Sequence, residues 1–207
     1  MFYKIKNIGN TCYFNSAIQM LLTLDKLNIL TQNVNTNNEF LLNYKKFITT
    51  NKAEYLYNIF KLYKCKNKQM DSNELLLKIL ETIENESICN LFYMKFSESS
   101  DKISNWINYD YLIDYLKDKS VEIYPKYLII NMWEDENDKI IKKIIINNNT
   151  YKILNMLCFI GNDNNGHYFI LHKKNHKWYK IDDDTITEFD KKNIKFIKII
   201  TIIYENK

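Results

Sequence analysis

The first part of the chain carries apolar residues at helical spacing. Five of them repeat at i, i+3, i+4, i+7 and i+8: Phe14, Ala17, Ile18, Leu21 and Leu22. This spacing predicts a helix that begins next to Cys12 and buries one face. The same kind of periodicity predicts helices over about 39–49, 53–64 and 104–118, while the polar, Asn-rich residues 31–38 predict a loop.

The period changes to that of strands later in the chain. Runs rich in β-branched and aromatic residues predict strands over 88–96, 127–133, 140–146, 151–160, 168–173, 178–181 and 194–204. Asn/Asp-rich turns between them favour an antiparallel sheet. We therefore expect an α+β fold in one domain over residues 1–207, with a mainly helical lobe to about residue 120 and a mainly β lobe from about 121.

A further helix is predicted to follow Asp71. Aspartate is a good N-cap, and Glu74 stands three residues later, which is the spacing of a capping box. The apolar stripe that would face the core is Leu75, Leu76, Ile79, Leu80 and Ile83. On these grounds alone, Asp71 and Glu74 are residues that cap a helix.

Composition narrows the function classes. All 29 basic residues of this 207-residue chain are lysine, and the net charge of +4 is modest, so charge alone does not indicate nucleic-acid binding. The absence of arginine and the abundance of asparagine and isoleucine are typical of an A/T-rich genome, as in some large DNA viruses or parasites. No signal peptide or long apolar span is visible, which predicts no membrane association.

The four cysteines are far apart and form no C-x-x-C pair. Reduced thiols in a cytosol-like compartment, cytoplasmic or nuclear (in the host cell if the source is viral), fit this pattern, and nothing indicates a zinc site or another cofactor. We expect Cys65, Cys89 and Cys158 to be structural.

Cys12 differs because a glycine-containing turn leads into it and a helix follows. Unpaired N–H groups and the positive end of the helix dipole favour a thiolate there, which makes Cys12 a candidate nucleophile. The alternative is a small buried residue, the usual fate of a free cysteine.

A second candidate string runs from Gly161 to Ile170 and contains His167 at the start of a predicted strand; the segment from Trp178 to Asp184 follows after a turn. The three glycines of the chain are Gly9, Gly161 and Gly166, all in these two strings. This placement indicates that backbone freedom was needed there. The alternative for His167 is an ordinary surface or core histidine, which is also our interpretation of His172 and His176.

These strings resemble the signatures of one enzyme family. NxGNTCYxNSxxQ around Cys12 resembles the Cys box of the ubiquitin-specific proteases, which are papain-like deubiquitinases, and G-H-Y…W-x-x-I-D-D resembles their His box. Gln69 to Leu75 resembles their acidic signature Q-x-D-[AS]-x-E-[FL], and the strand after Pro125 resembles another conserved stretch, although Trp133-Glu134-Asp135 replaces its usual basic pair.

The resemblance implies a papain-like cysteine protease fold. The family's zinc-stapled "fingers" insertion would leave the core near residues 97–102, where few residues are available, so the fingers are expected to be absent or reduced. The implied partners are ubiquitin, polyubiquitin chains and ubiquitinated proteins, and we expect a monomer that needs no cofactor and binds no nucleic acid.

The resemblance also implies a role for individual residues. Cys12 is the nucleophile, His167 the base, Asp182 the acid that orients the imidazole, and Asp183 a reserve for that role or a helper to water and substrate. Asn7 stands where the family keeps an amide that stabilises the oxyanion.

Three further residues are implied to bind substrate. Asp71 and Glu74 would grip the basic C-terminal tail of ubiquitin, and Tyr168 would line a tunnel that admits only its Gly-Gly end. Rival hypotheses are the same chemistry on another ubiquitin-like modifier or a plain peptide, a non-catalytic ubiquitin-binding module, and a nucleic-acid-binding domain, which only the lysine content suggests.

Overall fold

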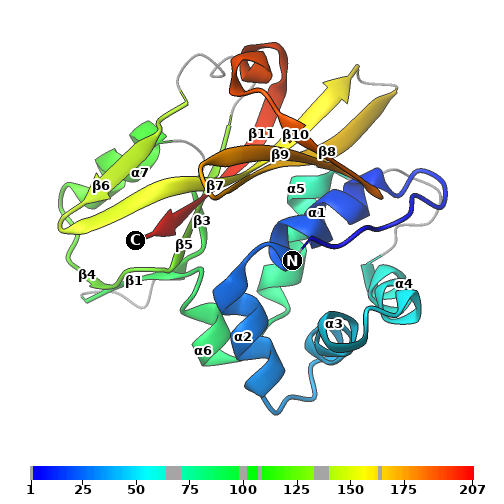
Figure 1. The fold of residues 1–207 in the computed structure, drawn as a ribbon. Helices are drawn as coiled ribbons and strands as arrows, with labels where there is room; N and C mark the ends of the chain where they lie inside the picture. The colour runs from blue at the N-terminus through cyan, green and yellow to red at the C-terminus, as the bar shows by residue number, and fades with distance from the viewer. Residues whose placement is uncertain (1, 64–70, 98–101, 107–108, 133–139, 163–164) are drawn as a thin grey trace.

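The computed structural model describes residues 2–63, 71–97, 102–106, 109–132, 140–162 and 165–207. Six helices in the first part of the chain lie on one side of a large sheet, and the first of them packs directly on it (Figure 1). They are α1 (Cys12–Leu22), α2 (Asp25–Asn33), α3 (Glu39–Thr50), α4 (Ala53–Tyr63), α5 (Ser72–Glu81) and α6 (Glu86–Cys89). None of the described helices is long and apolar enough to cross a membrane.

Helix α2 was not predicted, and it takes up the beginning of the expected loop. Leu27 and Thr31 lie one turn apart on its buried side, so Thr31 belongs to the helix rather than to the loop. The polar connection is therefore limited to residues 34–38. Helices α3, α4 and α5 are confirmed close to their predicted bounds.

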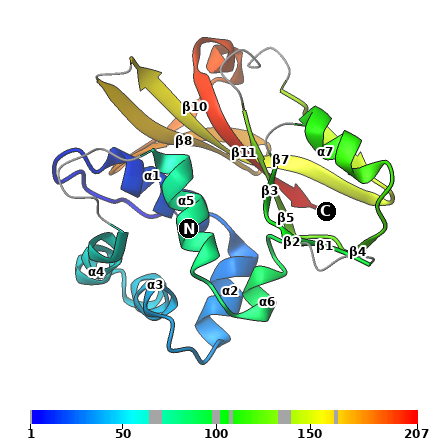
Figure 2. The same cartoon turned by 180° about the vertical axis from the view of Figure 1, so that it is seen from behind.

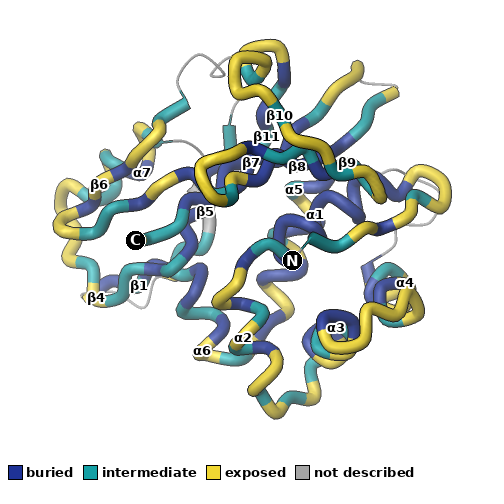
Figure 3. Tube along the Cα trace, in the orientation of Figure 1, coloured by how far each residue is buried: buried dark blue, intermediate teal, exposed yellow. Residues whose placement is uncertain are grey.

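Helix α1 is buried on all sides rather than on one face. Every residue from Cys12 to Leu22 is buried, as the continuous dark-blue tube in Figure 3 shows. The helix lies between strands of the sheet and α5, which Figure 2 shows beside it from behind. The predicted amphipathic helix is therefore wrong in this respect, because Asn15 and Gln19 face partners inside the protein and not water.

The described residues form one eight-stranded sheet with the strand order β10-β9-β8-β7-β11-β5-β3, and β6 pairs with β7. Its strands are β3 (Asn105–Trp106), β5 (Tyr127–Asn131), β6 (Lys143–Ile146), β7 (Asn149–Gly161), β8 (Gly166–Lys174), β9 (Lys177–Asp182), β10 (Thr185–Phe189) and β11 (Lys198–Asn206). All pairs are antiparallel except β3 with β5. The predicted α+β class is confirmed.

A smaller sheet has the order β2-β1-β4, with β1 (Met94–Phe96), β2 (Lys102–Ile103) and β4 (Val121–Ile123); α7 (Tyr109–Leu116) lies between β3 and β4 in the chain. The predicted strand over 88–96 is wrong up to residue 93, because Asn85 caps the short helix α6 by accepting from the Ile88 N–H and turns follow it. The predicted helix over 104–118 is confirmed for Tyr109–Leu116, whereas Asn105–Trp106 form β3 instead.

Two further differences concern the end of the chain. Strand β10 was not predicted, and a 3-10 helix (Lys191–Phe196) occupies the beginning of the last predicted strand. Asp190 caps this turn by accepting from the Lys192 N–H, so β11 begins only at Lys198.

The large sheet separates two hydrophobic cores. One core lies between the sheet and the helices and includes Ile170 and Ile181, whereas the other lies on the opposite face and includes Phe169 and Leu171. This alternation along β8 is what a strand buried on both faces requires. Helix α7 and the 3-10 turn cover the second face (Figure 1).

Candidate active site

A tight turn leads the chain into Cys12, the first residue of α1. Gly9 and Asn10 have φ of 103° and 51°, in the region that glycine and asparagine tolerate. The side-chain oxygen of Asn7 holds this turn, because it accepts from the Gly9 N–H at 3.0 Å and from the Thr11 N–H at 3.3 Å. The position of Cys12 is therefore fixed locally by an Asx-type turn.

Residue Cys12 is only 3% exposed, and this burial is the main influence on the pKa of its thiol. Burial raises the pKa of Cys12, and the negative charge of Asp183 raises it further; hydrogen bonds from the backbone at Tyr168, Tyr13 and Cys12 itself lower it without reversing the shift. The backbone N–H groups at the start of α1 thus lower the pKa of Cys12, as expected, but the net shift is upward. The effect of desolvation on this pKa is larger than the opposite effect of the N–H groups at the helix N-terminus.

His167 and Asp182 form a close pair across strands β8 and β9. The imidazole Nε2 lies 2.5 Å from Asp182 Oδ1, and the other carboxylate oxygen accepts from Lys180 Nζ at 2.7 Å. Burial acts to raise the pKa of Asp182, but the hydrogen bonds from Lys180 and His167 outweigh it, so that the pKa lies below its usual value. Asp182 is thus an anion and His167 Nε2 is the donor.

This arrangement leaves Nδ1 as the proton-accepting nitrogen of a neutral His167. Within the described part of the chain, Nδ1 has no hydrogen-bond partner. The Cys12 sulfur interacts with the backbone of Tyr168, the residue that follows His167. Thiol, imidazole and carboxylate thus come together from the start of α1, the start of β8 and the end of β9.

Asp183 does not orient the imidazole. Its carboxylate accepts from Asn7 Nδ2 at 3.0 Å and from Asn15 Nδ2 at 2.6 Å, and its carbonyl oxygen accepts from Gln19 Nε2 at 2.6 Å. Its φ of 53° turns the chain out of β9. Asp183 therefore ties the end of β9 to α1 and to the turn before it.

Sequence reasoning gave no role to Asn15, Gln19 or Lys180. For the first two a signal existed, because they lie one turn apart on a helix that is otherwise almost entirely apolar. Lys180 carried no comparable signal, since lysine is common throughout this chain. Its ammonium group also lies over the Phe169 ring, 4.3 Å from the ring centroid, so two contacts hold it.

Asp71 caps α5, as predicted, and also contacts β8. Its Oδ1 accepts from the N–H groups of Asn73 at 2.8 Å and Glu74 at 3.0 Å, while Oδ2 accepts from the Tyr168 hydroxyl at 2.8 Å. Glu74 is exposed and makes no hydrogen bond or ion pair with any residue that the structure describes, so the reciprocal half of the capping box is not formed there.

Tyr168 is held in place on both sides. Its ring packs on Phe159 with the centroids 4.9 Å apart, and its hydroxyl contacts Asp71. Burial, and then Asp71, raise the pKa of the Tyr168 hydroxyl well above its ordinary value, so it remains a donor. Asp71 and Tyr168 therefore form one rigid unit beside Cys12, and Glu74 is the free carboxylate next to it.

Three of these side chains lie close enough together to be considered as ligands of one metal ion. Ligand atoms of His167, Asp182 and Asp183 lie within 4.8 Å of one another. The carboxylates already accept from donors, however, and the Lys180 ammonium group 2.7 Å from Asp182 would repel a cation. The donor set does not favour a metal ion.

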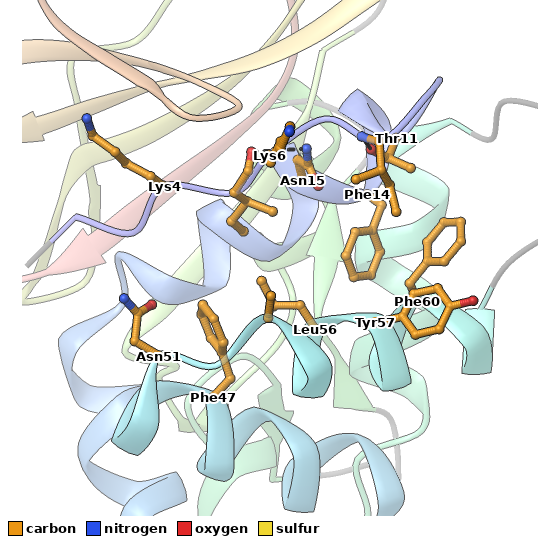
Figure 4. A pocket seen from close by; sticks show the side chains of 13 residues that line it. Lys4, Lys6, Thr11, Phe14, Asn15, Phe47, Asn51, Leu56, Tyr57 and Phe60 are labelled. Atoms are coloured by element: carbon orange, nitrogen blue, oxygen red, sulfur yellow. Dashed lines mark hydrogen bonds between the residues drawn. The ribbon is translucent and has the colours of Figure 1, made fainter.

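A hollow of about 320 Å³ lies behind the turn that carries Cys12, between residues 4–11 and helices α3 and α4 (Figure 4). Aromatic side chains line it: Phe14, Phe47, Tyr57 and Phe60. Neither His167 nor Asp182 lines it, so it is separate from this candidate pair, although Thr11 and Asn15 lie between the two.

Comparison with known proteins agrees with this geometry. A model of the family described as ubiquitin carboxyl-terminal hydrolase matches residues 90–202, a range that contains His167 and Asp182 but not Cys12. A search of curated proteins gave no significant match.

Solved structures show the same fold. One of the SAGA Ubp8/Sgf11/Sus1/Sgf73 DUB module matches with a TM-score of 0.71 and 14% identity over 99% of this chain and 68% of that one. The same module bound to monoubiquitin gives a TM-score of 0.68 at 14% identity over 99% and 69%. An essential yeast splicing factor gives a TM-score of 0.68 at 12% identity over 100% and 69%.

At these identities the solved structures establish the fold alone, and they confirm the predicted papain-like, deubiquitinase-type architecture. The family assignment rests on the sequence match, which spans more than half of the chain. The protein therefore belongs to the ubiquitin carboxyl-terminal hydrolase family.

Proposed function

We propose that this protein is a cysteine deubiquitinase, which hydrolyses the peptide or isopeptide bond after the C-terminal Gly-Gly of ubiquitin. The observation that carries the proposal is the 2.5 Å contact between His167 and Asp182 beside the buried thiol of Cys12. Membership of the ubiquitin carboxyl-terminal hydrolase family supports the substrate, and so does a structural neighbour that is bound to monoubiquitin.

The raised pKa of Cys12 determines how the reaction begins. The resting thiol transfers its proton to His167 Nδ1 as the sulfur attacks the carbonyl carbon, and Asp182 stabilises the imidazolium through Nε2. The tetrahedral intermediate collapses to a thioester on Cys12 while His167 gives the proton to the leaving lysine amine. Water, deprotonated by His167, then hydrolyses the thioester.

The developing oxyanion needs donors, for which the Cys12 N–H and Asn7 are our candidates. Asn7 Nδ2 carries two hydrogens, and one of them points to Asp183 Oδ2 at 3.0 Å. The second hydrogen is then available for substrate. Because Asn7 also holds the turn before Cys12, it is both a donor and a positioning residue in this proposal.

Asp71, Glu74 and Tyr168 are the proposed tail-binding residues. A basic tail that passes this unit would meet the exposed Glu74 carboxylate and the capping carboxylate of Asp71. Asp71→Asn keeps a good N-cap but removes the charge, so we expect KM to rise several-fold with little loss of stability. Unchanged KM in steady-state assays with a ubiquitin C-terminal reporter would leave Asp71 with the capping role alone.

The decisive experiment uses a ubiquitin probe with a C-terminal electrophile. We expect the native chain to form a covalent adduct, Cys12→Ala to form none, and Cys89→Ala, which removes another free thiol, to react like the native chain. An adduct that persists in Cys12→Ala, or no adduct with the native chain, contradicts the proposal. Parallel probes of other ubiquitin-like modifiers test selectivity.

The second candidate is a non-catalytic ubiquitin-binding module. It is favoured by the buried, neutral thiol and by the fold that this chain shares with a protein described as a splicing factor. Reversible binding of ubiquitin without adduct formation would establish this alternative.

Three expectations from the sequence stay predictions: location in the cytoplasm or nucleus, an A/T-rich source such as a large DNA virus, and a monomeric state. The DUB-module structures name several subunits, so light scattering on the purified chain is the direct test of its oligomeric state.

A further inference from the structure

A second hollow lies on the opposite face of the large sheet from α1. It measures about 550 Å³ and is bordered by the start of the β6 region, by β7, by the turn end of the β8–β9 hairpin and by the 3-10 turn at residues 191–196. This 3-10 turn lies on the side of the sheet away from α1 (Figure 1). Five lysines line the hollow: Lys142, Lys173, Lys191, Lys192 and Lys195.

These positive charges are not compensated within the described part of the chain. None of the five lysines makes an ion pair there, although neighbouring lysines on the same hairpin do: Lys177 pairs with Glu188 at 2.8 Å and Lys180 with Asp182 at 2.7 Å. Lysines 142, 173, 191, 192 and 195 are all exposed. The surrounding charge therefore favours an anionic occupant.

The floor of the hollow is apolar. Ile153, Met156 and Trp178 belong to the core on this face of the sheet, and Ile194 packs against it from the 3-10 turn. An occupant would gain most by placing an apolar or aromatic side chain on this floor. Met156 is a side chain that adapts to different shapes. Lys173 lies 6.0 Å from the centroid of the Trp178 ring, so its charge borders the floor.

We infer that this hollow binds an acidic peptide segment of a partner protein, with an apolar side chain on the floor and carboxylates among the five lysines. A phosphorylated sugar or a nucleic-acid backbone would match the charge but would leave the apolar floor without a partner. An acidic peptide that carries a hydrophobic anchor satisfies both features.

The hollow lies on the same strand as one residue of the proposed catalytic centre. Trp178, Lys180 and Asp182 alternate along β9 and so lie on the same face of the sheet. Four residues of strand correspond to about 13 Å between Trp178 and Asp182. A bound segment would thus lie near the catalytic pair without covering Cys12. Peptide binding itself does not depend on the proposed activity.

The test is fluorescence anisotropy with a labelled peptide of glutamates around a central tryptophan–leucine pair. We expect saturable binding that weakens with added salt, and a dissociation constant raised on the order of five-fold in Lys191→Gln/Lys192→Gln. The matched control, Lys52→Gln/Lys61→Gln, removes the same charge from exposed positions at α4 and should bind like the native chain.

The peptide itself is also varied. Replacing its glutamates by glutamine, or its tryptophan–leucine pair by serines, should weaken binding several-fold. The inference is overturned if the control variant loses as much affinity as the 191/192 variant, or if the serine peptide binds equally well. It is also overturned if a single-stranded oligonucleotide or inositol hexakisphosphate binds through the same lysines more tightly than the peptide.

One competitor lies in the chain itself. The acidic residues 134, 135, 136 and 138, which lie outside the described residues, precede Ile140 at the edge of the hollow. A variant with these four residues changed to their amides should bind the peptide as the native chain does, or more tightly. Binding that occurs only in this variant would show that the site serves an internal contact, and would overturn the inference.

Discussion

The buried histidine His172 makes the stability of this protein depend on pH. It is 5% exposed, and its Nδ1 lies 2.6 Å from Asn155 Oδ1, while Asn155 Nδ2 donates to Thr23 Oγ1 at 2.8 Å. The Phe2 and His172 rings pack edge to face, with their centroids 5.7 Å apart. This small network connects β7 and β8 to the end of α1, and the burial of the ring within it disfavours the charged imidazolium.

Burial lowers the pKa of His172 from 6.5 to about 4; the positive charges of Lys174 and the N-terminus act in the same direction, and Glu205 opposes them. The unfolded chain therefore binds a proton near pH 6.5 that the folded chain does not bind until about pH 4. Stability from this group is fully present above about pH 7 and falls as the pH drops. A difference of about 2.5 in pKa corresponds to a loss of about 3 kcal/mol.

Urea unfolding followed by fluorescence across this pH range measures the loss. We expect His172→Gln to be less stable than the native chain at neutral pH but to lose less additional stability between about pH 6.5 and 4. His176→Gln, at the exposed turn of the same hairpin, is the control and should keep the native slope. An unchanged slope in His172→Gln, or a flattened slope in the control, would refute the reasoning.

Three further predictions concern the site. Lys180→Met removes the counter-ion of Asp182, so the acid limb of the kcat/KM profile should move to higher pH, with activity roughly 3- to 10-fold lower below about pH 6. The control variant Lys180→Arg should keep a near-native profile. An unchanged profile in Lys180→Met would contradict this prediction. Gly166→Ala places a Cβ 1.9 Å from the Phe159 ring, so thermal unfolding should show a loss of about 1–3 kcal/mol that Phe159→Leu partly restores; full stability without the second change would be the contrary result. Asp183→Asn removes a charge that raises the pKa of the Cys12 thiol, so alkylation of Cys12 should begin at lower pH, and an unshifted alkylation profile would count against that contribution.

Features with local causes could be predicted from the sequence. The N-cap at Asp71 and the start of α1 at Cys12 depend on residues within a few positions, and the structure has both. Helices α3 and α4 follow apolar periodicity in the same way. The predicted strand over 88–96 was wrong because of another local feature. The cap at Asn85 competed with β propensity and produced α6.

Features that depend on distant contacts could not be predicted from the pattern alone. Asp182 and Asp183 are adjacent and chemically identical, yet the first contacts His167 and the second contacts Asn7 and Asn15, more than 160 residues away in the chain. Which neighbour takes which role depends on the turn out of β9 and on where α1 packs.

The sequence by itself therefore determined the candidate residues for the chemistry, their order, and the local turns and caps that precede or contain them. Only the tertiary structure decided which carboxylate contacts His167, that α1 is buried on every side, and that burial raises the pKa of the Cys12 thiol. The physical reason is range: hydrogen-bonded caps and periodicity act over one or two turns, whereas burial and charge proximity depend on segments that meet only when the chain folds.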